Sequence, residues 1–100
     1  MSNTISRTNK EKSYEQFKKI MDSDLSDDQA VMDIIQNCSS SIYTGTFDSG
    51  DSFTLGIEKG VGMRISTYQS NNWIRINDYE LEKDENGELF IVRSESYEKE

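Results

Sequence analysis

The spacing of apolar residues changes once along this chain, at Ser41. Before this residue, apolar side chains recur at intervals of three and four; after it, they alternate with polar ones. The first spacing places side chains on one face of a helix, and the second places them on one face of a β-strand. The chain of 100 residues is therefore expected to form helices first and a sheet second, within one domain.

The first predicted helix runs from about Asn9 to Asp22, and residues 1–8 are expected to be a disordered arm because they are polar. Thr8 and Glu11 have the spacing of a capping box, which marks the start of a helix. The apolar residues that follow at helical spacing are Tyr14, Phe17, Ile20 and Met21.

The second predicted helix runs from about Asp27 to Asn37. Ser26 is its expected N-cap, since Gln29 follows three positions later as the other half of a capping box. Its apolar stripe consists of Ala30, Val31, Ile34, Ile35 and Cys38. Cys38 is the only cysteine, so no internal disulfide can form, and we expect its side chain to lie in the core.

Five strands are predicted after the helices, at residues 41–47, 52–57, 61–68, 72–81 and 89–93. Asn86-Gly87 is the strongest hairpin signal, and residues 95–100 are expected to be a polar tail. Short connections make consecutive strands neighbours. A sheet with one apolar face must be covered, so the expected fold is α+β: two N-terminal helices packed on one face of a five-stranded antiparallel meander, spanning residues 9–94.

The fourth predicted strand contains the only tryptophan and has two different faces. One face has Trp73, Arg75, Asn77 and Tyr79, and the other has Ile74 and Ile76. If the isoleucines face the helices, the Trp73 face is open to solvent and could anchor a protein interface or stack nucleobases. In the structural alternative, Trp73 and Tyr79 pair across strands with aromatic residues such as Tyr68 and Phe90.

Acidic residues outnumber basic residues by 19 to 11, which gives a net charge of −8. Such a surface repels DNA and anionic membranes and attracts a cationic partner. Residues 22–58 contain eight acids and no base, and one acidic cluster lies there: Asp22, Asp24, Asp27, Asp28 and Asp33. The helix dipole already accounts for Asp27 and Asp28 at the start of the second helix, so this cluster is the secondary candidate.

A second acidic cluster covers the fourth strand and the turn after it: Asp78, Glu80, Glu82, Asp84 and Glu85. The first three alternate along the strand, so they share one face. Like charges at this spacing slightly oppose sheet formation, and folding alone does not require them. The predicted partner-binding site is this cluster together with Trp73, Arg75 and Tyr79; the alternative is a solvated face that only keeps the protein soluble.

Several kinds of site are not expected. The chain has no histidine, which removes the usual general base and zinc ligand, and we assign no catalytic residue and expect no enzyme. The segment from Asp22 to Asp33 begins like a calcium loop but lacks the glycine and the final glutamate, so no metal and no cofactor are expected. Because no apolar signal or spanning segment is present, we expect a cytoplasmic protein without a membrane partner.

In size, acidity and lack of catalytic residues, the chain resembles phage-encoded anti-defence proteins, such as anti-CRISPR proteins and uracil-glycosylase inhibitors. This resemblance implies an inhibitor that occupies a basic, nucleic-acid-binding site of a larger protein, such as a nuclease, in the cytoplasm of the host cell. It assigns no role to any single residue.

Two alternatives to this interpretation stay open. An immunity or antitoxin protein that neutralises a basic toxin would use the same electrostatics. A module of a different class would bind a ligand or single-stranded nucleic acid on the sheet face at Trp73, although the acids beside that face argue against direct nucleic-acid binding. The sequence does not specify an oligomeric state.

Overall fold

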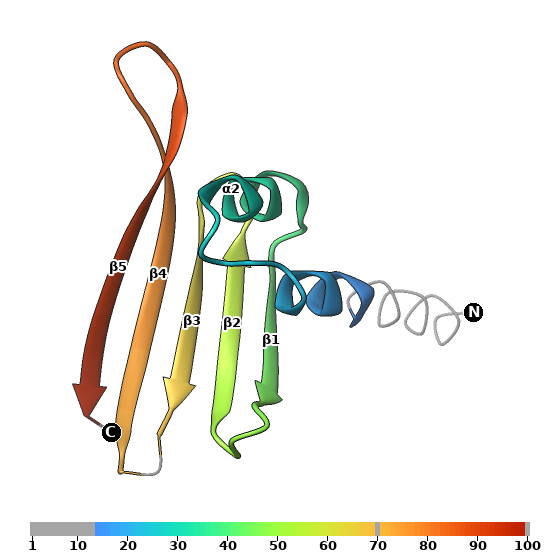
Figure 1. Ribbon diagram of the computed structural model, residues 1–100, viewed down its shortest axis with the longest axis vertical. Coiled ribbons are helices and arrows are strands. Elements are labelled where there is room, and N and C mark those ends of the chain that lie inside the picture. The colour runs from blue at the N-terminus through green and yellow to red at the C-terminus, as the bar shows by residue number, and fades with distance from the viewer. Residues whose placement is uncertain (1–13, 70, 100) are drawn as a thin grey trace.

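The computed structural model describes residues 14–69 and 71–99 (Figure 1). Residues 14–21 are helical, and α2 spans Asp28–Asn37. The strands are β1 (Ser41–Thr46), β2 (Ser52–Glu58), β3 (Gly62–Tyr68), β4 (Trp73–Lys83) and β5 (Leu89–Lys99). They form one antiparallel sheet in the order β1-β2-β3-β4-β5, which confirms the predicted α+β fold with N-terminal helices and a meander sheet.

Two predictions concern residues 1–13. The disordered arm at residues 1–8 and the capping box of Thr8 and Glu11 both lie outside the described residues. Within the two described ranges, no helix is both long enough and apolar enough to cross a membrane.

The start of α2 differs by one residue from the prediction. Asp27 is the N-cap, and its side chain accepts a hydrogen bond from the backbone N–H of Gln29 at 3.1 Å. Ser26 instead donates both its backbone N–H and its hydroxyl to the carboxylate of Asp24. Ser26 as N-cap is therefore wrong, because a local turn around Asp24 already uses its polar groups.

The last strand is longer than predicted. β5 continues to Lys99, and its register pairs Trp73 with Lys99 at one end and Lys83 with Leu89 at the other. Residues 95–99, which we expected to be part of a polar tail, therefore belong to the sheet. Their strand conformation comes from pairing with β4, and an exposed, polar strand segment carries no apolar alternation that the sequence could reveal.

Both described helices lie on one face of the sheet, in front of the strands in Figure 1. We call this the helix face and the opposite side the open face. The pairing register assigns side chains to each: Leu55 lies opposite Ile65, and Ile65 lies opposite Asn77. Because Leu55 is fully buried in the core beneath the helices, Asn77 also lies on the helix face.

β4 therefore has the reverse of the orientation in which Ile74 and Ile76 would face the helices. Its helix face has Trp73, Arg75, Asn77 and Tyr79, and its open face has Ile74 and Ile76. Ile76 is 6% exposed but is not part of the cluster between the sheet and the helices. A strand with apolar residues on both sides has two plausible orientations, and a shift of one residue in register exchanges them.

The core lies between the helices and the helix face. Its buried members are Ile20, Val31, Ile34, Ile35, Cys38, Phe53, Leu55, Ile57, Met63, Ile65 and Ile91. The predicted burial of Cys38 is confirmed. Aromatic rings extend the core toward β1, since the Phe17 ring lies 5.2 Å from that of Tyr43 and 6.0 Å from that of Phe53, centroid to centroid. Such contacts add stabilisation beyond their buried area.

Polar contacts fix the helices relative to the sheet. The amide nitrogen of Gln16 donates to the Tyr43 hydroxyl at 2.6 Å and to the carbonyl of Ser39 at 3.1 Å, while its amide oxygen accepts from the Ser39 N–H. At the end of α2, the carbonyl of Ile35 accepts from the N–H of Gly60 in the β2–β3 turn at 2.8 Å. The helices are thus held to β1 and to the β2–β3 turn by directional bonds as well as by apolar burial.

The β4–β5 hairpin extends beyond the other strands and forms the top of Figure 1. β3 pairs with β4 only as far as Gly62 and Glu80, whereas β4 and β5 remain paired as far as Lys83 and Leu89. A Cβ atom at Gly62 would lie 2.6 Å from the carbonyl oxygen of Tyr79, so glycine is required where the two strands approach. Beyond this point, β4 makes one further bond to the β2–β3 turn, from the Leu81 N–H to the carbonyl of Val61 at 2.9 Å, and β5 remains its strand partner.

Leu55→Ala is expected to lower the free energy of unfolding by about 2–5 kcal/mol, because it leaves a cavity in the core. Ile42→Ala is the control: Ile42 is 77% exposed on β1, and its truncation should change stability by less than about 0.5 kcal/mol. Urea denaturation measures both. Equal losses for the two variants would contradict the assignment of the two sheet faces.

Cys38 should react slowly in the folded protein. Its side chain is buried, and burial raises the pKa of its thiol, which disfavours the reactive thiolate. We expect iodoacetamide at pH 8 to alkylate Cys38 several-fold more slowly in native protein than in urea-unfolded protein, since burial both shields the sulfur and disfavours the thiolate. Mass spectrometry follows the reaction, and equal rates would show that the core opens at Cys38.

Candidate functional site

Acidic and basic side chains of the described strands lie on different faces of the sheet. The open face has five acids and one base, a net charge of −4: Glu58, Arg64, Asp78, Glu80, Glu82 and Glu98. The helix face has four bases and one acid, a net charge of +3: Arg75, Lys83, Arg93, Glu95 and Lys99. The site predicted from sequence is therefore divided, because its β4 acids lie on one face and Trp73, Arg75 and Tyr79 lie on the other.

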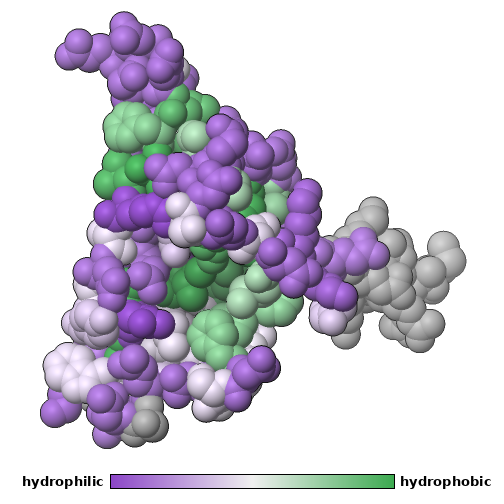
Figure 2. Space-filling view, in the orientation of Figure 1, coloured by the Kyte–Doolittle hydropathy of each residue, from purple (hydrophilic) through white to green (hydrophobic). Residues whose placement is uncertain are grey.

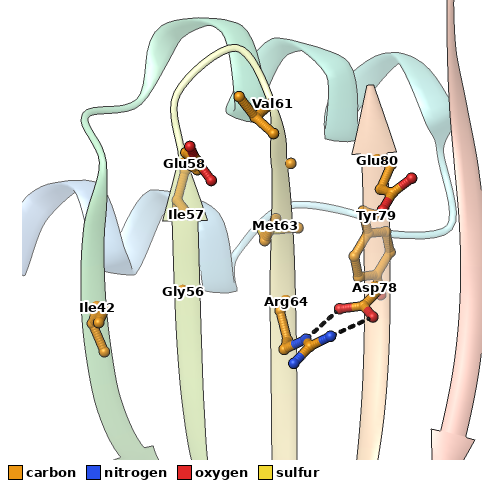
Figure 3. Close-up of a pocket in the computed structure, with 11 residues that line it drawn as sticks. Ile42, Gly56, Ile57, Glu58, Val61, Met63, Arg64, Asp78, Tyr79 and Glu80 are labelled. Atoms are coloured by element: carbon orange, nitrogen blue, oxygen red, sulfur yellow. Dashed lines mark hydrogen bonds and ion pairs between the residues drawn. The ribbon is translucent and has the colours of Figure 1, made fainter. Parts of the chain in front are cut away.

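Asp78 is neutralised within the sheet. It lies opposite Arg64 on the open face, and the two side chains form two parallel bonds, Nε to Oδ1 at 2.6 Å and Nη2 to Oδ2 at 3.0 Å (Figure 3). These bonds and the negative charge of Asp78 raise the pKa of Arg64. Bidentate pairs of this kind are more specific than single ion pairs, so Asp78 serves cross-strand pairing and is less available to a partner.

Asp84 shapes the turn of the β4–β5 hairpin. Its Oδ1 accepts hydrogen bonds from the N–H groups of Asn86 at 2.8 Å and Glu88 at 2.9 Å. Gly87 has a φ of 81°, and its N–H donates to the carbonyl of Asp84. The hairpin signal at Asn86-Gly87 is thus realised as a longer connection between Lys83 and Leu89 in which only the glycine needs the left-handed conformation.

Glu80 and Glu82 form no ion pair with any residue in the described part of the chain, and both are exposed. Each lies beside an exposed apolar residue of β5: Glu80 is opposite Val92, which is 42% exposed, and Glu82 is opposite Phe90, which is 43% exposed. Exposed acids without apolar neighbours would be explained by solubility alone. Exposed apolar side chains surrounded by polar ones can instead mark a surface that contacts another protein.

A shallow depression of about 350 Å³ lies on the open face beside Glu80 (Figure 3). Gly56 and Gly62 form its floor because neither has a side chain, and Ile42 and Val61 supply apolar walls. Glu58, Glu80 and the Arg64–Asp78 pair also line it. The sequence pattern alone does not predict this depression, although a glycine inside a strand can mark a place where another molecule approaches.

Most acids of the secondary cluster already have local partners. Asp27 caps α2, and the bonds from Ser26 lower the pKa of Asp24. Asp28 accepts from Arg93 of β5 at 2.7 Å, and Asp33 accepts from Gln29 at 3.1 Å. Asp22 is exposed. Among the described residues, no group of acids or cysteine is arranged to hold a metal ion. The open face is therefore the stronger candidate for partner binding.

The predicted pairing of Trp73 and Tyr79 with Tyr68 and Phe90 is wrong, because the latter two lie on the open face. Tyr79 packs at the edge of the core, and the Arg93 guanidinium lies 5.3 Å from the centre of its ring. Figure 2 shows the helix side: the hairpin tip is hydrophilic, and apolar surface lies directly below it.

Trp73 lies away from the helices, where it is 39% exposed. Its neighbour on the same face, Arg75, lies opposite Tyr97 of β5, which is 55% exposed. The Nε atom of Arg75 is buried without a hydrogen-bond partner among the described residues. The Tyr97 hydroxyl donates to Glu95 at 2.6 Å, which raises the pKa of Tyr97. Tyr97 is not among the predicted site residues, because it falls in the segment predicted to be a tail.

Comparisons of the chain with family models, with curated protein sequences and with solved structures find no match.

Asp84→Ala should lower the free energy of unfolding by about 0.5–1.5 kcal/mol per hydrogen bond lost in the turn. Glu85→Ala is the control at the next position, because Glu85 is exposed and makes no side-chain hydrogen bond in the described structure, so its effect should stay within about 0.5 kcal/mol. Urea denaturation measures both variants. Indistinguishable stabilities would mean that the carboxylate of Asp84 does not hold the turn.

Proposed function

We propose that this protein is an inhibitor that binds a basic surface of a larger protein through the open face of its sheet. The observation that carries the proposal is the separation of charge: the face that neither described helix covers has a net charge of −4, and exposed apolar residues lie among its acids. A face of this sign and composition is complementary to a basic protein surface.

The natural target is a nucleic-acid-binding site, because such sites gather lysine and arginine for phosphate groups. The carboxylates of Glu80 and Glu82 would occupy positions otherwise taken by phosphates, while Phe90 and Val92 would supply apolar contact area that nucleic acid lacks on its backbone. A nuclease inhibited by a phage anti-defence protein of the anti-CRISPR type would fit this description. An immunity or antitoxin protein that covers a basic toxin would use the same face, so the identity of the captured partner distinguishes the two.

Charge reversal on the hairpin tests the proposal. A partner is first captured from lysate of the native host on immobilised protein, and its association is then measured by surface plasmon resonance. The triple variant Glu80→Lys, Glu82→Lys, Glu85→Lys should slow association by about tenfold or more, because long-range attraction speeds encounter. Wild-type association should also slow as salt rises from about 0.05 M to about 0.15 M.

The matched control changes the net charge equally but leaves the open face intact. Glu15→Lys, Asp22→Lys, Asp33→Lys alters exposed acids of the N-terminal part of the chain, and its association rate should remain much closer to that of the wild type. If both triple variants slow association equally, overall charge and not the open face governs binding. If neither does, the proposal is wrong.

A second candidate function is supported by one observation on the helix face. Trp73 and Tyr97 are exposed on either side of Arg75, whose Nε has no hydrogen-bond partner among the described residues, on a face with a net charge of +3. Aromatic rings beside an arginine can stack a base and bind its phosphate. This surface could therefore bind a planar anionic ligand or single-stranded nucleic acid.

Trp73 is the only tryptophan, so its fluorescence reports on this second candidate directly. On titration with a ten-nucleotide oligo-dT, binding at this surface should quench the emission in a saturable way, and Arg75→Ala should weaken the affinity by about tenfold, the range expected for one stacked or ionic contact. Lys83→Ala is the control, since it removes a base of the same face at the distant hairpin end. An unchanged emission spectrum would eliminate the candidate.

A further inference from the structure

The described strands contain three glycines, and the fold requires only two of them. A Cβ atom at Gly45 would lie 2.7 Å from the Phe53 ring, and one at Gly62 would lie 2.6 Å from the carbonyl oxygen of Tyr79. A Cβ atom at Gly56 would meet nothing within 4 Å. Gly56 also has no left-handed backbone conformation, which is found at Gly50, Gly60 and Gly87.

Gly56 therefore weakens β2 without a structural reason inside the described chain. A glycine in a strand interior has no side chain to pack and loses more backbone entropy on folding than other residues do. Because Gly56 has no side chain, its backbone forms part of the floor of the depression on the open face. The register places Ile42 on one side of Gly56 and Arg64 on the other, so the depression is bounded across the strands.

The walls of the depression suit an amphipathic, positively charged side chain. Ile42 and Val61 are 77% and 52% exposed and offer apolar contact. Glu58 and Glu80 both lie opposite Gly62, one on each neighbouring strand, so their Cα atoms are about 10 Å apart, twice the usual strand spacing. A cation above Gly62 would therefore lie between the two strands that carry these carboxylates.

We propose that the depression at Gly56 receives an arginine or lysine side chain of the basic partner, an inference that rests on the proposed function. The aliphatic stem lies over Gly56 and Gly62 against Ile42 and Val61, and the charged end lies between Glu58 and Glu80. An apolar side chain would displace water from these two carboxylates without supplying a charge or a hydrogen bond in its place. A volume of about 350 Å³ is at the small end for ligand pockets, which fits one long side chain.

The decisive variant is Gly56→Val, which fills the depression and leaves every charge in place. Because the space is open and valine favours strands, the melting temperature should stay the same or rise. Affinity for the captured partner should fall by about tenfold or more, mainly through faster dissociation, since short-range packing is lost while long-range attraction is kept. The double reversal Glu82→Lys, Glu85→Lys leaves Glu80 and the rest of the depression in place and acts mainly on association, so the two effects are separable.

A defined probe tests the same contact without the partner. The amide resonances of Gly56 and Gly62 are followed by NMR during titration with a pentapeptide that contains two arginines, and with the matched peptide that contains two glutamines. Only the arginine peptide should shift both resonances in a saturable way. Gly56→Val should abolish the shift of the Gly62 resonance, and the double variant Glu58→Gln, Glu80→Gln should weaken the peptide affinity by about tenfold, as expected for lost charge-assisted contacts.

Two results would overturn the inference. One is an arginine-peptide shift that persists in Gly56→Val or that is largest at Gly87 on the hairpin tip. The other is partner binding by Gly56→Val that equals the wild type while charge reversal on the hairpin still slows association. This second result would contradict the proposal for the depression and leave the proposed function unaffected. If charge reversal also had no effect on association, the proposed function would be wrong as well.

Discussion

The pairing register between β3 and β4 is the constraint on which the rest of this surface depends. It places Ile65 opposite Asn77 and Arg64 opposite Asp78, so that one set of β4 side chains lies on the helix face and the other lies on the open face. Because side chains alternate with a period of two, a slip of one residue would exchange the two sets completely. The bidentate Arg64–Asp78 bond and the close approach at Gly62 are both formed in the observed register.

This register explains why a protein with a net charge of −8 has a helix face of the opposite sign. The bases of β4 and β5 lie beside or beyond the helices, where Arg93 pairs with Asp28 of α2 and lies near the ring of Tyr79. All acids of the same strands except Glu95 lie on the other side, where no described helix can pair with them. Charge that helps attach α2 to the sheet is thereby separated from charge that is available for binding.

The acids of the predicted site differ in how far the fold already uses them. Asp78 is occupied by Arg64, and Asp84 is occupied by the backbone of the turn. Glu80 and Glu82 have no such role in the described structure, and they lie beside exposed apolar residues on a hairpin that extends beyond the sheet. A residue whose polar atoms are unused by its own chain keeps its full interaction energy for a partner, because no internal bond must break first.

The sequence by itself determined the order and type of the elements, the burial of Cys38 and the position of the turns, because each follows from spacing or chemistry within a few residues. The orientation of β4, the extension of β5 to Lys99 and the hollow at Gly56 were decided only by the tertiary structure. Ile74 and Ile76 are as apolar as a core face requires, so local pattern favoured the wrong side. Each of these features depends on cross-strand neighbours that are distant in the sequence, and the pairing of whole strands selects one arrangement among several that local patterns allow equally.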